Sequence, residues 1–285
     1  MKSNEIRVDK NRKSTIANPQ SIITLLTDFG TQDYFAGAMK GVVLSINPAA
    51  VIVDITHDIP PQDIHAGAFN LLACHRDFPP GTIHVAVVDP GVGSDRRAIV
   101  IECSNQFFVG PDNGLFCWIV QREGNYRAYK ISNQKWFRHP LSNTFHGRDI
   151  FAPVAAALST GADITEVGPV LDNIVQLEPL TPKVLPDGRI EGVIIHVDHF
   201  GNCVTNFTAK HLGDDATDAN LQLRISETEI SSVRKFFTDK TGKDDELFMY
   251  LGSAGFIEIG MRNASAAAFL NARRGQSLTL VTDAA

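Results

Sequence analysis

Residues 84–97, HVAVVDPGVGSDRR, contain the side chains of this sequence that are best placed to do chemistry. The apolar run 85–88 predicts a buried strand. Asp89 follows at its carboxyl end, the edge at which open α/β sheets bind ligands. A proline and two glycines then permit a turn that can bring Asp89 and the guanidinium groups of Arg96 and Arg97 towards one point. Two interpretations stay open for this segment: an acid–guanidinium active site, or a tight turn with a surface ion pair.

Carboxylates also follow other predicted strands of the N-terminal half. Asp28, Asp54 and Asp112 lie at or just after the ends of predicted strands, as Asp89 does. The carboxyl ends of parallel strands meet at one edge of a sheet, where carboxylates often accept hydrogen bonds from ribose hydroxyls or amines. Each acid alone is simply explained as a cap, but their common position predicts a ligand-binding edge. His146 lies on a loop before a predicted helix, a position that is typical of functional residues.

A metal-dependent hydrolase is an alternative hypothesis. Segments 54–58 (DITHD) and 196–199 (HVDH) offer oxygen and imidazole ligands. Their spacing does not match the helical His-Glu-x-x-His pattern, so strand-end polar residues and caps explain them more simply. The sequence contains neither a Gly-x-Ser-x-Gly elbow nor the Gly-Lys-Ser/Thr of a phosphate loop, which argues against serine-based acyl transfer and phosphate cradling.

The elements that position these groups alternate between strands and helices. Strands are predicted at 22–26, 51–55 and 85–88, with helices over 34–46 and 64–78 between them. This order is typical of βαβ units around a mainly parallel sheet. Further strands and helices follow, at 98–103, 107–109, 115–121, 126–131 and 150–158. We therefore predict an α/β N-terminal domain over residues 22–178, preceded by a flexible polar extension, residues 1–21.

The C-terminal part has a different pattern. Residues 179–189 contain prolines and an Asp-Gly pair and predict a linker. Short strands then recur with little helical signal, which predicts a smaller antiparallel, barrel-like β domain over residues 190–285. The strands are expected at 190–197, 203–207, 221–225, 247–251, 256–261 and 277–281.

Composition limits the classes of partner. The chain of 285 residues has a formal net charge of −6, which argues against nucleic-acid binding because that needs a concentrated basic face. Its four cysteines are far apart and fit reduced core thiols, so we expect a cytoplasmic protein. No run approaches the roughly 20 apolar residues that span a bilayer, and residues 1–21 lack the apolar centre of a secretory signal, so no membrane role is expected.

Six short motifs occur in order between residue 22 and the C-terminus. They are TDFG (27–30), VDPGVGSDRR (88–97), GPDNGL (110–115), FHGRD (145–149), DHFGNCVTN (198–206) and SAGFIEI (253–259). In this set the chain resembles the S-adenosylmethionine hydroxide adenosyltransferases, which are adenosine-forming S-adenosylmethionine hydrolases related to the fluorinase and chlorinase. The resemblance implies hydrolysis of S-adenosylmethionine to adenosine and methionine by in-line attack of water at C5′.

The resemblance also implies roles for individual residues. Asp89, Arg96 and His146 match the set that positions and activates the water. Seven further positions match substrate contacts. These are Asp28 for the ribose hydroxyls, Phe145 for the wall around the adenosine, Asp198 for the methionine amine, Asn202 for the adenine, Ser253 and Ala254 for the amino-acid end, and Gln62, which replaces a tryptophan of the fluorinase pocket.

Family members are trimers whose sites lie between the first domain of one subunit and the second domain of its neighbour, so a homotrimer is expected here. The resemblance implies neither a metal nor a cofactor, with S-adenosylmethionine as substrate. Two departures disfavour halide transfer: the segment between Cys103 and Phe107 is short, and Gly147 stands where the fluorinase has a serine beside the halide. A non-catalytic S-adenosylmethionine or adenosine-binding protein and a halide-using adenosyl transferase remain alternatives.

Overall fold

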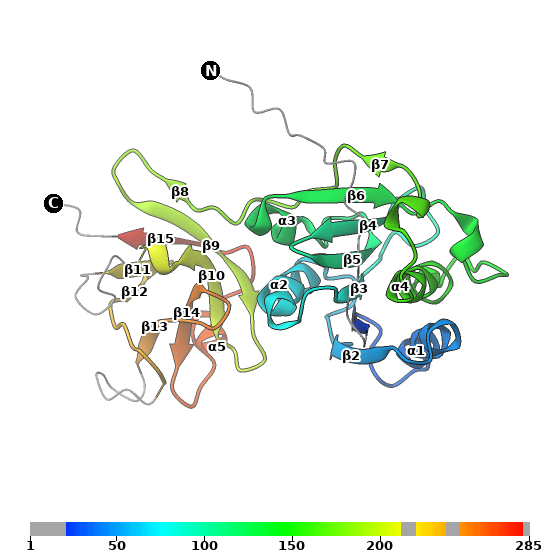
Figure 1. Cartoon of the computed structure of the whole chain (residues 1–285). Helices are drawn as coiled ribbons and strands as arrows, with labels where there is room; N and C mark the ends of the chain where they lie inside the picture. Colours follow the sequence, from blue (N-terminus) through cyan, green and yellow to red (C-terminus); the bar gives the residue numbers. More distant parts are fainter. Residues whose placement is uncertain (1–20, 212–220, 238–245, 282–285) are drawn as a thin grey trace, which may run out of the picture. The chain divides into compact units, whose positions relative to one another are not determined.

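The computed structural model describes residues 21–211, 221–237 and 246–281 (Figure 1). The chain forms two compact units. Among these residues, unit 1 comprises 21–62, 78–113 and 123–175, and unit 2 comprises 63–77, 114–122, 176–211, 221–237 and 246–281. The α/β fold class is confirmed, with βαβ order in the N-terminal half and an antiparallel sheet in the C-terminal half.

Unit 1 is built on a seven-stranded mixed sheet with the strand order β2-β1-β3-β5-β4-β6-β7. Its strands are β1 (Ile22–Thr27), β2 (Val51–Thr56), β3 (Ile83–Val87), β4 (Ala98–Cys103), β5 (Gln106–Pro111), β6 (Tyr126–Lys130) and β7 (Val170–Leu171). Strands β2, β1, β3 and β5 pair in parallel, whereas β4, β6 and β7 pair antiparallel. Parallel pairing is therefore confined to the half of the sheet whose strands lead to Asp28, Asp89 and Asp112, whereas Asp54 lies inside β2 rather than at its end.

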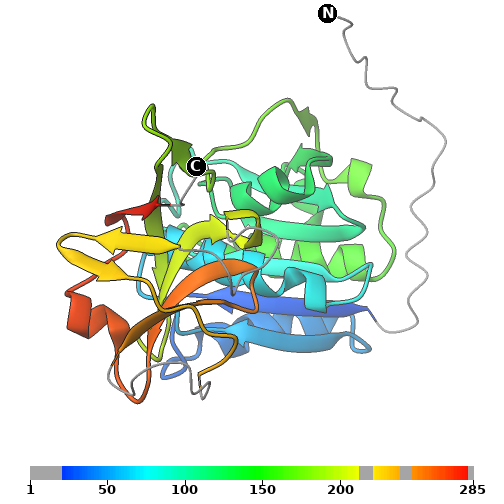
Figure 2. The same cartoon turned by 90° about the vertical axis from the view of Figure 1, so that its left-hand side faces the viewer.

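Helices α1 (Phe35–Ile46) and α4 (Ala152–Ser159) pack together, and α4 lies against β1 and β3. Their apolar residues form one core cluster with the sheet, in which Met39, Val85 and Phe151 are buried. Unit 1 also contains short helices at Gln134–Trp136, Gly147–Phe151 and Ile164–Glu166. The second of these is a π-helix that runs directly into α4, and it carries the residues after His146. Figure 2 shows β1 and β2 side by side in blue.

Unit 2 is built on an eight-stranded antiparallel sheet. Seven strands follow the order β12-β11-β15-β9-β10-β14-β13, and β8 pairs with β9. The edge strands β12 and β13 also contact each other, so the sheet is nearly closed, as the sequence predicts for a barrel-like domain. Its strands are β8 (Lys183–Val184), β9 (Ile190–Val197), β10 (Cys203–Thr208), β11 (Gln222–Ile225), β12 (Thr228–Ile230), β13 (Leu247–Leu251), β14 (Phe256–Met261) and β15 (Ser277–Val281).

The helices of unit 2 are α2 (Ile64–Cys74), α3 (Cys117–Glu123) and α5 (Ala266–Leu270), with short turns of 3-10 helix at His75–Asp77 and Ala209–His211. The α2 helix contacts β9, where Phe69 stacks on His196 with ring centroids 4.4 Å apart. The predicted domain limits, with a linker at 179–189, stay a prediction. No helix among the described residues is both long and apolar enough to cross a bilayer.

Candidate active site

Asp89, Arg96 and His146 converge in unit 1. Asp89 lies two residues beyond β3, and both of its carboxylate oxygens accept from Arg96 Nε at 3.0 Å. Arg96 Nη2 donates to Asp89 Oδ2 at 2.5 Å and lies 2.7 Å from His146 Nδ1. The side chains of Asp89 and Arg96 are only 5% and 11% exposed. The arrangement therefore matches an acid–guanidinium site rather than a surface ion pair.

The turn after β3 brings these groups together. Val92 N donates to Asp89 O at 3.2 Å and Ser94 N donates to Gly91 O at 3.1 Å, which curls the chain back on itself. Gly93 has φ +79°, and a Cβ there would lie 2.4 Å from the carbonyl oxygen of Asn143. Only glycine therefore lets the loop before His146 pack directly on this turn.

Arg97 does not join the cluster, which corrects the expectation that both arginines could turn towards Asp89. Its Nε donates to Asp112 Oδ2 at 2.6 Å, and its guanidinium also reaches Asn173. Asp112 is buried, and its other oxygen accepts from Val175 N at 2.8 Å. This second ion pair ties β4 to β5 and the segment before unit 2.

His146 is held by a buried network around Asp149. The Asp149 carboxylate accepts from Arg148 Nε at 2.7 Å, from Ser142 N at 2.9 Å and from Arg138 Nη1 at 3.2 Å. Burial opposes the charged form, but the bonds from Arg148 and Ser142 outweigh it and lower the pKa of Asp149. One carboxylate thus ties the loop from 138 to 145 to the π-helix that begins next to His146.

The surroundings of His146 keep its ring neutral. Burial, and then the positive charge of Arg96, lower the pKa of His146 below the ordinary histidine value. A guanidinium can only donate hydrogen bonds, so Nδ1 must accept from Arg96 and the ring proton must lie on Nε2. In this tautomer His146 can donate from Nε2 to a neighbouring oxygen but cannot act as a base while it faces Arg96.

Three substrate-contact candidates, Asp28, Gln62 and Phe145, belong to unit 1. Asp28 follows β1, and its Oδ2 accepts from the backbone N–H of Gln62 at 2.8 Å. Gln62 adopts φ +66°, a conformation that is strained for a side-chain-bearing residue and clusters at functional sites. Phe145 packs edge-to-face on Phe35, with ring centroids 5.2 Å apart. The Arg148 guanidinium lies 5.0 Å from the centre of the Phe145 ring.

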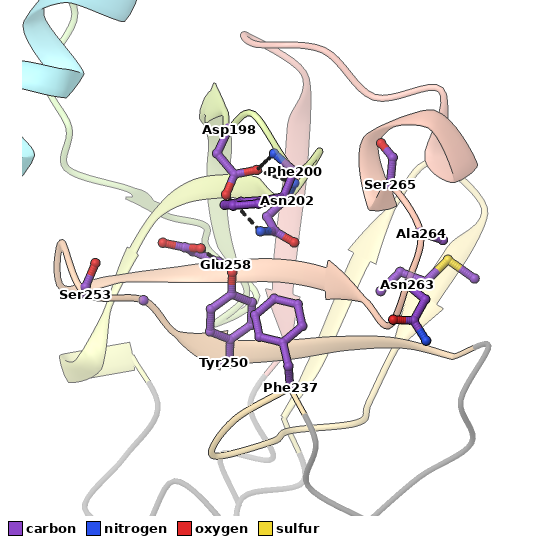
Figure 3. Close-up of a pocket in the computed structure, with 12 residues that line it drawn as sticks. Asp198, Phe200, Asn202, Phe237, Tyr250, Ser253, Glu258, Asn263, Ala264 and Ser265 are labelled. Atoms are coloured by element: carbon purple, nitrogen blue, oxygen red, sulfur yellow. Dashed lines mark hydrogen bonds between the residues drawn. The ribbon is translucent and has the colours of Figure 1, made fainter. Parts of the chain in front are cut away.

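The other candidates gather in unit 2. Asp198, Asn202 and Ser253 line a pocket of about 760 Å³, and Ala254 lies next to it in the turn between β13 and β14 (Figure 3). Asp198 Oδ1 accepts from the backbone N–H groups of Phe200 and Asn202 at 2.9 and 2.8 Å, and its Oδ2 accepts from Asn202 Nδ2 at 2.8 Å. The turn after β9 therefore positions Asp198 and Asn202 as one unit.

Sequence reasoning missed the rest of this pocket. Glu258 and Tyr250 lie opposite each other on β14 and β13, and Tyr250 Oη donates to Glu258 Oε2. Phe237 also lines the pocket and packs against the Tyr250 ring with centroids 4.9 Å apart. The one signal in the sequence is an acid in an otherwise apolar strand, since β14 reads FIEIGM.

The polar residues of segment 54–58 are engaged locally. Asp54 Oδ2 accepts from Lys40 Nζ at 2.5 Å, its Oδ1 lies 3.1 Å from His57 Nε2, and His57 Nδ1 lies 2.8 Å from Thr27 Oγ1. Asp54 therefore takes part in a strand-end ion pair. Within residues 21–211, 221–237 and 246–281, no cluster of three or more potential His, Cys, Asp or Glu ligands is found.

Comparison with known proteins agrees with this geometry. Residues 23–168 match the SAM hydroxide adenosyltransferase N-terminal domain, and residues 192–279 match the SAM hydroxide adenosyltransferase C-terminal domain. The chain belongs to this family.

Its relatives cover almost the whole chain. It is 38% identical to the (R)-S-adenosyl-L-methionine hydrolase of Methanocaldococcus jannaschii, over 86% of this chain and 90% of the relative. The enzyme of the same name from Salinispora arenicola is 36% identical over 90% of this chain and 96% of its own length. A conserved protein of Thermotoga maritima has a similar structure, with a TM-score of 0.83 and 36% sequence identity. The match covers 90% of this chain and 99% of the Thermotoga maritima chain. The fluorinase of an Actinoplanes species is more distant, at 28% identity over 93% of this chain and 98% of its own length.

Proposed function

We propose that this protein is an enzyme that hydrolyses S-adenosylmethionine to adenosine and methionine. The observation that carries the proposal is the convergence of Asp89, Arg96 and His146 at the carboxyl edge of the parallel strands, in a chain of the hydroxide adenosyltransferase family. Asp28 and Phe145 of unit 1 are assigned to the ribose and adenosine wall. Asp198, Asn202, Ser253 and Ala254 of unit 2 are assigned to the adenine and the amino-acid end.

The chemistry is an in-line displacement at C5′. The water oxygen forms a bond to C5′ while the C5′–S bond breaks, and its electron pair stays on sulfur, which leaves as the neutral thioether of methionine. The water loses one proton, which Asp89 accepts or passes to solvent. Charge is neutralised as the transition state forms, and a site with little bulk water strengthens that attraction.

Within the cluster, the hydrogen bonds indicate a separate role for each of the three residues. Arg96 contacts both oxygens of Asp89 and so fixes the carboxylate in one orientation. The Nε2–H of neutral His146 is a donor to the attacking oxygen, which leaves Asp89 as the group that accepts the water proton. Holding water near C5′ contributes on the order of 7–11 kcal/mol against a dilute reference, whereas base catalysis contributes roughly 10²- to 10⁴-fold. Orientation is thus the larger effect.

Halide transfer fits this chain less well than hydrolysis does. A Cβ at Gly147 would lie 3.1 Å from Met39 Sδ, so a serine at this position would require the buried Met39 side chain to shift by a few tenths of an ångström. Residues 104 and 105, both with positive φ, form the tight connection between β4 and β5. Incubation of the purified protein with S-adenosylmethionine in buffer with and without chloride tests the assignment. Adenosine is expected in both; a chlorinated nucleoside would indicate a transferase, and intact substrate would indicate a binding protein.

The relatives' name specifies the (R) epimer at sulfur, and we extend that preference to this protein. Sulfur carries the adenosyl carbon, the methionine chain, a methyl group and a lone pair. Once the adenosine and amino-acid ends are held, inversion exchanges the methyl group with the lone pair and moves the methyl into a different part of the site. Separate assays of the two epimers should give a higher kcat/KM for (R). Equal values would refute the extension.

We also propose a cytoplasmic homotrimer in which unit 1 of one subunit and unit 2 of its neighbour complete each site. Large aromatic side chains are exposed beside both half-sites, with Tyr34 at 66% and Phe200 at 77%. Co-expression of Asp89→Asn and Asp198→Asn chains tests the arrangement. Mixed trimers should regain activity, because one site per trimer combines an intact Asp89 with an intact Asp198. No recovery in isolated mixed oligomers, or a monomer by light scattering, would refute it.

A further inference from the structure

Glu258 is a second carboxylate in the pocket that contains Asp198. The remaining described lining contains no lysine, arginine or histidine. Figure 3 shows Glu258 between Asp198 and Tyr250. Within the described lining, the ionisable groups other than the Tyr250 phenol are therefore both acids.

The position of Glu258 is built into the two strands. Tyr250, opposite it on β13, donates its hydroxyl proton to Oε2. Oε1 occupies the space beside Gly252, where a Cβ would lie only 1.9 Å from it. Any residue larger than glycine at position 252 would push the carboxylate away. The Tyr250 hydroxyl thus orients Oε2, and Oε1 can take its place only because residue 252 has no side chain.

Two carboxylates in one pocket repel each other unless cations join them. Burial, and then the charge of Asp198, raise the pKa of Glu258, although the bond from Tyr250 works in the other direction. Protonation or a ligand that carries positive charge relieves this repulsion, and only the ligand leaves both carboxylates ionised. Asp198 has the methionine amine as its assigned partner, so one carboxylate is left over.

The substrate has a second cation to offer. S-adenosylmethionine carries an ammonium and a sulfonium group against one carboxylate, whereas adenosine and methionine carry no net charge. We infer that Glu258 is a specificity-determining residue that faces the sulfonium and selects the cationic substrate over neutral thioether ligands and over its own products. This inference rests on the proposed function and adds to it. Loss of the sulfonium charge on reaction would also favour product release.

The test compares two ligands that differ at sulfur. S-adenosylhomocysteine shares the ammonium, carboxylate and adenosine of the substrate but has a neutral thioether. We expect Glu258→Gln to raise the KM for S-adenosylmethionine about tenfold, the order of one screened charge–charge interaction, and to change the Ki of S-adenosylhomocysteine less than twofold. Glu227→Gln removes the same charge from an exposed turn of unit 2 and should change neither constant.

Three outcomes for Glu258→Gln would overturn the inference. Equal weakening of both ligands would place Glu258 against the ammonium that they share, and no weakening would remove it from recognition. A fall in kcat with both constants unchanged would assign it to a later step. Tyr250→Phe removes the hydroxyl that orients Oε2 and favours its charged form, so it should weaken S-adenosylmethionine more than S-adenosylhomocysteine even if Glu258→Gln folds poorly; equal effects on the two ligands there would also count against the assignment. Absence of any turnover by the wild-type protein would instead refute the proposed function.

Discussion

The substitution Asp89→Asn separates water activation from ordinary packing. The side chains differ by one atom, and the amide oxygen can still accept from Arg96, but Asn cannot take a proton from water. Loss of the base and of its orientation should lower kcat by about 10²- to 10⁴-fold. KM should change little because the substrate contacts assigned here lie elsewhere.

The same change will also destabilise the fold, since it leaves the largely buried Arg96 without its counter-charge. Removing one partner of a buried pair costs about 3–5 kcal/mol, and the retained acceptor should bring the loss to roughly 2–3 kcal/mol. Asp112→Asn is a matched control. It breaks an Asp–Arg pair at the same edge, with a carboxylate that is 1% exposed, but it lies outside the cluster.

Adenosine formation should be followed by chromatography under single-turnover conditions, with protein stability measured by denaturant titration. Both variants should unfold more easily than the wild type, and only Asp89→Asn should lose turnover. If Asp89→Asn retained kcat within about twofold, or if Asp112→Asn lost as much, the assignment of Asp89 to water activation would be wrong.

Three further predictions concern His146, Asp149 and Gln62. Since burial and Arg96 lower the pKa of His146, its neutral form persists on acidification, and kcat/KM should stay level through the ordinary histidine value of about 6.5 and fall only below it. A fall centred at or above that value in a pH profile would contradict the lowered pKa. Asp149→Asn should lower kcat about tenfold or more with KM little changed, because it loosens the loop that positions His146; a proportional rise in KM would instead assign it to binding. Gln62→Gly keeps the N–H that donates to Asp28 and relieves the strain at φ +66°, so denaturant titration should show stability unchanged or raised by about 1 kcal/mol, and a loss of that size would contradict the strain.

Much of the fold could be predicted from apolar patterning. Three parallel strands and α1 follow from runs and periodicities that the structure confirms, with ends within a few residues. Two features were beyond such reasoning. The strands β4 and β5 form a tight hairpin, which makes half of the sheet antiparallel, and pairing direction leaves no periodic signal. The π-helix Gly147–Phe151 runs directly into α4, and its five residues are too few to show a periodicity of their own.

Prediction of the site depended on which groups the chain brings together. Asp89 and Arg96 were predictable because the turn between them is short and glycine-rich. The diversion of Arg97 to Asp112 was not, since both arginines are within reach of Asp89 in sequence and only the direction of β4 decides between them. Glu258 was overlooked because an acid inside an apolar strand gives no indication of which face it occupies until Tyr250 is seen opposite it.

The most direct test of the central claim is hydrolysis in water enriched in oxygen-18. If water attacks C5′, adenosine should carry one heavy oxygen at its 5′ position, and methionine formed in the same reaction should carry none beyond background. Unlabelled adenosine, or cleavage to products other than adenosine and methionine, would contradict the account.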